Sequence, residues 1–342
     1  MKNVLLSFLL PLFLLVIISS CSKSNSSASN TAPTNLSVSA VVSTDSSGNV
    51  AFTASATNAT SYDYDFGDGS YLNVVSGITA YKYSTSGTYT VNVIAKNASG
   101  LITSKSIQIT VIVLQTAVWS DEFNINGAPD ASKWTYDLGA GGWGNSELEY
   151  YTSRPDNVVV QGGNLVITAK KESYSGSSYT SARLKTQGLY GFTYGRVEIS
   201  AKLPSSAGTW PALWMLGTDI KGAGWPSCGE IDIMEQKASQ LNTIFGTIHY
   251  PGHSGGSGVG STTVIANSST QFHKYTLDWS AIAIKMYVDD KLYFTVPNTG
   301  SLPFNQNFFL LINLAMGGTF GGTIDPSFAS DNLYVDYIRV YK

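Results

Sequence analysis

The chain has 342 residues, which is enough for two domains and a leader. Only 13% of its residues are charged, its formal net charge is −3, and no run of basic residues occurs, so the charge pattern excludes a typical nucleic-acid-binding protein. Many tyrosines, threonines and glycines with few charges indicate a secreted all-β protein.

The first 20 residues have the pattern of a secretory signal peptide. Lys2 supplies a positive charge, and residues 4–18 are almost wholly apolar but too few to span a bilayer comfortably. The run ends in Ser19-Ser20-Cys21, which resembles the lipobox of bacterial lipoproteins. This resemblance implies cleavage before Cys21, lipidation of its thiol, and anchoring in the bacterial cell envelope, at the outer membrane or cell surface. Ordinary cleavage beside an incidental cysteine is the alternative.

Residues 21–35 are rich in serine and asparagine and carry too little apolar surface to bury, so we expect a flexible tether. Residues 36–113 alternate period-two apolar segments with turns, which predicts strands. Within them, the segments 62–69 and 87–91 resemble a PKD domain, and this implies a small immunoglobulin-like sandwich.

Three aspartates of this region, Asp63, Asp65 and Asp68, could suggest a cation site. The run Phe66-Gly67-Asp68-Gly69 is also what a tight hairpin turn needs. We favour the turn.

Residues 117–342 again show short strands and glycine-rich turns, with no long helical period. This pattern favours an all-β sandwich or jelly roll over an α/β fold. The expected strands are 164–169, 195–202, 229–235, 243–249, 275–279, 282–288, 308–314 and 333–341. A hairpin turn is expected at Asp289-Asp290.

The segment 229–236, GEIDIMEQ, places three carboxylates within six residues. Glu230 and Asp232 would point to the same face of a strand, but strict alternation would send Glu235 to the other face. A β-bulge at Ile233 or Met234 would restore the common face, as bulges do beside active sites. Three like charges on one exposed strand repel one another, so the pattern indicates a site rather than a solvated face.

The segment resembles the bulged E-x-D-x-x-E signature of glycoside hydrolase family 16. Accompanying motifs lie in the same order, at 208–215, 224–228, 246–250, 272–279, 313–318 and 335–341. They are similar to the laminarinase (endo-β-1,3-glucanase) branch of that family, over about residues 117–342. The resemblance implies a concanavalin A-like jelly roll and a retaining hydrolase that needs no cofactor for catalysis.

In the family pattern, Glu230 matches the nucleophile and Glu235 the general acid/base, with Asp232 between them. A retaining glycosidase uses one ionised carboxylate and one protonated acid on either side of a sugar bond. Like charges on one face help to keep one of the acids protonated.

The resemblance implies that three polar side chains bind sugar in the cleft, Asn145, Arg183 and His249, and three indoles are expected to stack on sugar rings, Trp210, Trp214 and Trp225. Trp225 lies in a glycine-rich loop and is the preferred indole for the cleft, with Trp210 second. Because a tryptophan buries a large area wherever it sits, we expect one of the three in the core. A structural role is the alternative for His249.

Two residues near the acidic motif need separate comment. Lys237 stands where a smaller or neutral residue is expected, and Cys228 lies two residues before Glu230. Cys228 could be a nucleophile, but it has no basic neighbour in sequence, and packing is the favoured role.

A structural Ca²⁺ is implied by the resemblance, at positions matching Glu122, Gly163 and Asp336. The family binds it through backbone oxygens and one aspartate, which are ligands that suit Ca²⁺. The alternative is that Asp336 pairs with a neighbouring side chain.

The favoured function is an endo-acting, monomeric hydrolase of β-1,3-glucan, with the membrane as a second partner through Cys21. The PKD-like domain would be a spacer or make weak sugar contacts. Alternatives are a mixed-linkage β-1,3-1,4-glucanase, an agarase or carrageenase, and a catalytically silent glucan-binding lectin. The bulged spacing argues against the mixed-linkage glucanase, and the small number of basic residues argues against the agarase or carrageenase. The intact acidic trio argues against the lectin.

Overall fold

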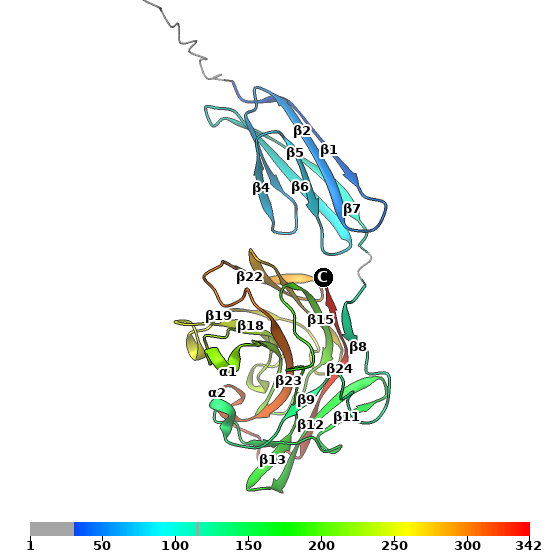
Figure 1. Ribbon diagram of the computed structural model, residues 1–342, viewed down its shortest axis with the longest axis vertical. Coiled ribbons are helices and arrows are strands. Elements are labelled where there is room, and N and C mark those ends of the chain that lie inside the picture. Colours follow the sequence, from blue (N-terminus) through cyan, green and yellow to red (C-terminus); the bar gives the residue numbers. More distant parts are fainter. Residues whose placement is uncertain (1–30, 114–115) are drawn as a thin grey trace, which may run out of the picture. The chain divides into compact units, whose positions relative to one another are not determined.

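The computed structural model describes residues 31–113 and 116–342, and it divides the chain into two compact units, Met1–Leu114 and Gln115–Lys342 (Figure 1). The predicted leader, Cys21 and most of the tether lie outside the described residues. Nearly all regular structure is strand, which confirms the all-β class. No helix within the described ranges is long and apolar enough to cross a membrane.

The first unit is a two-sheet sandwich. One sheet has the order β1-β2-β5 and the other β4-β3-β6-β7. Its strands are β1 (Thr34–Val42), β2 (Asn49–Thr57), β3 (Ser61–Asp65), β4 (Tyr71–Val74), β5 (Ile78–Lys82), β6 (Gly87–Lys96) and β7 (Ile102–Val111). Aromatic side chains such as Phe52, Tyr64 and Tyr83 fill the space between the sheets.

The aspartates of this unit act in turns and strand contacts. Asp65 Oδ1 accepts the Gly67 N–H at 3.0 Å, and Asp68 Oδ1 accepts the Ser70 N–H at 3.0 Å. Asp63 forms an ion pair with Lys96. These contacts support the turn interpretation rather than a cation site.

The second unit is a jelly-roll sandwich of a seven-stranded and a ten-stranded sheet. The seven-stranded sheet, in spatial order, contains β19 (Val259–Val264), β18 (Thr243–His249), β17 (Glu230–Glu235), β16 (Thr209–Gly217), β23 (Phe308–Met316), β14 (Arg183–Lys185) and β9 (Thr135–Asp137).

The other sheet runs in the order β10 (Glu149–Tyr151), β13 (Ser177–Ser181), β12 (Asn164–Tyr174), β24 (Ser330–Tyr341), β15 (Gly195–Lys202), β20 (His273–Trp279), β21 (Ala283–Val288) and β22 (Lys291–Pro297). On its margin β11 (Val158–Gln161) pairs with β12, and β8 (Trp119–Asp121) pairs with β24. The predicted Asp289-Asp290 turn joins β21 to β22, and both aspartates have positive φ, as a tight hairpin turn requires.

Short helices interrupt the loops of this unit. They are η1 (Gly142–Gly144), α1 (Ile220–Ala223), η2 (Ala238–Gln240), η3 (Gly255–Ser257) and α2 (Gly318–Gly321).

The main core lies between the two sheets of the second unit. Alternate side chains of facing strands enter it, among them Leu165, Val197, Ile231 and Ile312, which are all fully buried. β23 is buried on both faces, because its other alternate residues, Phe309 and Leu311, pack in a smaller cluster on the opposite side of the seven-stranded sheet. That opposite side carries the candidate site.

Candidate active site

The central feature of the site is a β-bulge in β17. Three residues of β18, from Thr247 to Phe245, face four residues of β17, from Asp232 to Glu235. The pairing with β16 shifts by one residue at the same place. Ile233 and Met234 are both buried in the main core, so the carboxyl groups on either side of them share one face. The predicted bulge is confirmed.

The bulge is accommodated by Gly246, which lies opposite it on β18. A Cβ at this position would lie 2.4 Å from Tyr293 Oη and 2.5 Å from Met286 Sδ. Both atoms come from the other sheet, and Tyr293 Oη also lies 3.4 Å from the carbonyl oxygen of Ile233. The absence of a side chain at 246 therefore lets the facing sheet reach the bulge backbone.

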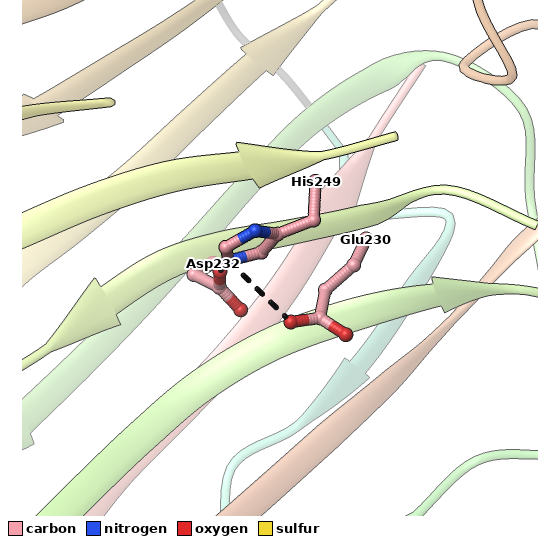
Figure 2. A group of neighbouring side chains, drawn as sticks. All are labelled: Glu230, Asp232 and His249. Carbon is pink, nitrogen blue, oxygen red and sulfur yellow. Dashed lines mark ion pairs between the residues drawn. The ribbon is translucent and has the colours of Figure 1, made fainter. Parts of the chain in front are cut away.

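The first two carboxylates of the motif lie beside His249 of β18 (Figure 2). His249 Nε2 is 3.1 Å from Asp232 Oδ2 and 3.8 Å from Glu230 Oε1. Glu230, Asp232 and His249 form the single group of metal-ligating side chains found among the described residues. Two carboxylates and an imidazole could hold a divalent cation, but the same contacts also orient the carboxylates for acid–base chemistry.

Each of the two glutamates accepts a hydrogen bond from an indole. Trp225 Nε1 donates to Glu230 Oε2 at 3.0 Å, and Trp210 Nε1 donates to Glu235 Oε1 at 2.9 Å. These bonds restrict the rotation of both carboxyl groups. One indole binds the first acid of the trio, and the other indole binds the last.

Burial raises the pKa of all three carboxyl groups. The charge of Asp232 adds to the rise at Glu230, and the charge of Glu235 adds to the rise at Asp232. The indole donors and the nearby His249 oppose these effects at the two glutamates. Because three neighbouring buried carboxylates repel one another, the site favours a state in which at least one remains protonated near neutral pH.

The expectation that one of the three tryptophans lies in the core is wrong. Trp210 and Trp214 occupy alternate positions of β16 and share the face of the acids, with Trp214 directly opposite Asp232. Both are partly exposed, and Trp225 is 49% exposed. The segment 209–217 was not expected to be a strand, so the common orientation of its two indoles was missed.

Arg183 and Asn145 reach the same side of the sheet. The Arg183 guanidinium lies between two indole rings, 5.0 Å from Trp143 and 4.7 Å from Trp214. Its Nε is 3.0 Å from Asp137 Oδ2. The backbone oxygen of Asn145 accepts the N–H of Thr319 in α2, which places Asn145 beside that helix. The structure thus brings the predicted sugar-binding residues to the same side of the seven-stranded sheet.

An aromatic wall beside Glu235 was not predicted. The Phe320 ring of α2 lies 5.2 Å from Trp210 and 5.1 Å from Phe245, which is paired with Glu235. The Lys237 ammonium lies 4.8 Å from the Phe320 ring and 5.2 Å from Phe245. Phe245 and His249 are four residues apart on one strand and therefore lie on the same face. This spacing was the available sequence signal that Phe245 lies on the face of the acids.

A groove of about 420 Å³ continues from this wall toward the sheet edge. Phe245 and Thr247 of β18 line it together with Gly258 and with Gly260, Ser261 and Thr262 of β19. Thr247 is the cross-strand neighbour of Asp232, so the groove lies directly beside the acidic trio.

Cys228 is fully buried in the small cluster with Leu216, Phe309 and Leu311. Burial raises the pKa of its thiol to about 11, which disfavours the nucleophilic thiolate. The packing role is confirmed.

The three positions predicted to bind Ca²⁺ converge along β24. The pairing of β24 with β12 ends at Val335, whose partner Leu165 lies two residues after Gly163, and its pairing with β8 begins at Ile338, whose partner Asp121 directly precedes Glu122. Asp336 lies between these two points. Two backbone carbonyls and one carboxylate there fit the oxygen ligands that Ca²⁺ prefers.

The side chains at these positions also have protein partners. Arg339 binds both oxygens of Glu122, at 2.9 and 2.7 Å, and Ser200 Oγ donates to Asp336 Oδ2 at 3.1 Å. The expected pairing of Asp336 with a neighbour is therefore present.

The comparisons with known proteins agree with this geometry. The sequence model of Glycosyl hydrolases family 16 matches residues 145–339, and that of the PKD domain matches residues 28–112. A β-glucanase of Rhodothermus marinus is 45% identical over 241 residues, which cover 66% of this chain and 84% of that protein.

Two solved structures are similar to the second unit. The laminarinase of Rhodothermus marinus has a TM-score of 0.64 at 45% identity, over 67% of this chain and 98% of that one. SCLam, a non-specific endo-β-1,3(4)-glucanase, has a TM-score of 0.64 at 42% identity, over 67% of this chain and 95% of that one. The bulged acidic strand, the indoles that bind its glutamates and these matches together show that the chain belongs to glycosyl hydrolases family 16.

Proposed function

We propose that the chain is an endo-acting, retaining hydrolase of β-1,3-glucan. The observation that carries the proposal is the bulge in β17, which places Glu230 and Glu235 on one face with Asp232 between them. The open groove beside the trio suits an internal segment of a polysaccharide rather than a chain end.

In the proposed first step, the Glu235 carboxyl gives its proton to the glycosidic oxygen as the bond from the anomeric carbon to that oxygen breaks. Glu230 forms a bond from its carboxylate oxygen to the same carbon. In the second step, the Glu235 carboxylate takes a proton from water, the water oxygen attacks the anomeric carbon, and Glu230 leaves as a carboxylate. The two roles follow the family pattern.

The surroundings act on the two glutamates in the same way, so the assignment of the two roles rests on the family pattern. The Trp225 N–H and His249 favour the ionised form of Glu230, and so oppose the burial that raises its pKa. Burial also raises the pKa of Glu235, which suits a proton donor, and the Trp210 N–H and His249 oppose that rise. Asp232 lies between them, and its charge adds to the rise in the pKa of Glu230.

The aromatic side chains suit a glucan. Pyranose rings have apolar faces that stack on aromatic rings, and Trp225, Trp214, Trp210 and Phe245 present rings along the acidic strand. The relatives named as a laminarinase and a β-glucanase favour β-1,3-linked glucan as substrate. The likeness to a non-specific β-1,3(4)-glucanase favours mixed-linkage glucan as the second candidate.

The first prediction concerns substrate choice. The protein should release reducing ends fastest from laminarin, more slowly from the mixed-linkage glucan lichenan, and not from agarose. Glu235→Ala should lower the rate on laminarin by about 10²–10⁴-fold, the usual value of a general acid. Cleavage of agarose in preference to both glucans, or no cleavage of any of the three, would contradict the proposal.

We also propose a structural Ca²⁺ bound by the backbone oxygens of Glu122 and Gly163 and by Asp336. Since a bound ion stabilises only the folded state, chelation with EDTA should lower the melting temperature, and added Ca²⁺ should restore it. Asp336→Asn should reduce the size of the shift. An unchanged melting temperature together with no calcium by elemental analysis would remove this site.

We propose further that the mature protein is lipid-anchored through Cys21 in the cell envelope and is otherwise a monomer. Cys21→Ser should block lipidation, so the protein should leave the membrane fraction or keep its leader. Cys228→Ser is the matched control and should leave fractionation unchanged. If Cys21→Ser stays in the membrane fraction with the mobility of the parent, the anchor is not at this residue.

A further inference from the structure

A second pair of acidic side chains lies near the cleft, separate from the trio in β17. Glu147 is 7% exposed and Glu149, in β10, is fully buried. The two are separated by one residue, and their carboxyl groups lie close enough to share a hydrogen bond when one of them carries a proton. Two adjacent buried carboxylates would repel strongly, so the pair needs a specific explanation.

The hydrogen bonds of Glu149 point to a proton. Its Oε2 accepts the backbone N–H of Met316 at 2.7 Å. Its Oε1 is buried and has no hydrogen-bond partner among the side chains and backbone of the described ranges. An orphaned carboxylate oxygen is costly in the interior, whereas a proton on Oε1 turns it into a donor for the neighbouring Glu147 carboxylate.

Glu147 in turn is connected to the sugar-binding side chains. Its Oε1 accepts Asn145 Nδ2 at 3.3 Å, and its Oε2 accepts Tyr151 Oη at 2.8 Å. Tyr151 Oη also accepts Asn313 Nδ2 at 3.0 Å. The chain of hydrogen bonds ends at Trp214, whose Nε1 donates to Asn313 Oδ1 at 2.8 Å.

We propose that Glu147 and Glu149 hold one proton between them and act as a positioning pair for the cleft. The protonated Glu149 fixes the Glu147 carboxylate. Glu147 then orients Asn145 directly, and orients Trp214 through Tyr151 and Asn313. The proposal rests on the proposed function in one respect, namely that Asn145 and Trp214 contact sugar.

The surrounding groups keep the proton in place. Burial first, and then the charge of Glu147, raise the pKa of Glu149 to about 9, and the Met316 N–H opposes this. Burial and both glutamates raise the pKa of Tyr151 well above its usual range, so its hydroxyl remains a donor.

The other charged and titratable neighbours come from adjacent strands. The charge of Arg183 in β14 lowers the pKa of Tyr151 and so opposes the glutamates. Arg183 also forms an ion pair with Asp137. Tyr179 of β13 is the cross-strand partner of Glu149.

The raised pKa of Glu149 determines whether the stability of the folded chain rises or falls with pH. At low pH, Glu149 is protonated in both the folded and the unfolded chain. Between the ordinary carboxyl pKa and the raised one, the unfolded chain loses the proton while the folded chain keeps it, so stability falls as pH rises. Above the raised pKa the pair carries two charges, and the hydrogen bond that holds Glu147 is lost.

The experiment uses Glu149→Gln, whose amide keeps a donor for Glu147 and an acceptor for Met316 but does not titrate. Its melting temperature, measured relative to wild type, should increase steadily from pH 5 to pH 9. Glu172→Gln is the matched control. Arg154 and Thr180 lower the pKa of Glu172, so this variant should show no such increase with pH. A difference for Glu149→Gln that is constant with pH would overturn the shared proton. This measurement needs no substrate, so its result is independent of the proposed function.

The positioning role is tested by binding of laminaritetraose in an inactive Glu230→Gln background. Between pH 7 and pH 9.5, this parent should lose affinity about tenfold, and the added Glu149→Gln should abolish the loss. Glu149→Leu, which has no donor, should weaken binding about tenfold already at pH 7. Equal loss of affinity with pH in the presence and absence of Glu149→Gln would overturn the role of the pair. If the parent does not bind the oligosaccharide at pH 7, the proposed substrate is wrong instead.

Discussion

The site depends on one extra residue in a β-strand. Without the bulge, the strict alternation of β17 would turn Glu235 into the apolar core, where Ile233 and Met234 now lie. With the bulge, Glu235 faces the cleft together with Glu230 and Asp232. The strand can therefore fill the core of a sandwich and still present three acids to a substrate.

Other parts of the structure are arranged around that irregularity. Gly246 leaves space opposite the bulge, and Tyr293 and Met286 from the facing sheet occupy it. On the cleft side, the indoles of Trp210 and Trp225 bind the outer two acids. Burial would otherwise push all three carboxyl groups toward the neutral form, so these donors offset part of the cost of keeping charge in the site. The same tryptophans offer ring surface to sugar, and this joins acid–base tuning with substrate binding.

The fold class, the bulge and the packing role of Cys228 could be predicted from sequence, because each depends on local alternation or composition. The tryptophans of β16 were partly misjudged. Pro211 and the small residues of 209–217 obscure the strand pattern, and without a strand nothing indicates that Trp210 and Trp214 share a face.

The aromatic wall and the Glu147–Glu149 pair were missed for another reason. Phe245 and Phe320 are distant in sequence and meet only after β18 and α2 are placed. The two glutamates are close in sequence, but an alternating pair of acids usually lies on a solvated face. Only the burial of β10 against β23 shows that Glu149 has no access to water.

In the proposed mechanism, the bulge sets Glu230 and Glu235 on opposite sides of one sugar bond, at the short separation of a retaining enzyme, about 5–5.5 Å. The most direct test is proton NMR of the first product released from laminarin, recorded before mutarotation. The account predicts a new reducing end in the β configuration. A first product in the α configuration would show inversion, and would contradict both the proposed spacing and the role of Glu230 as nucleophile.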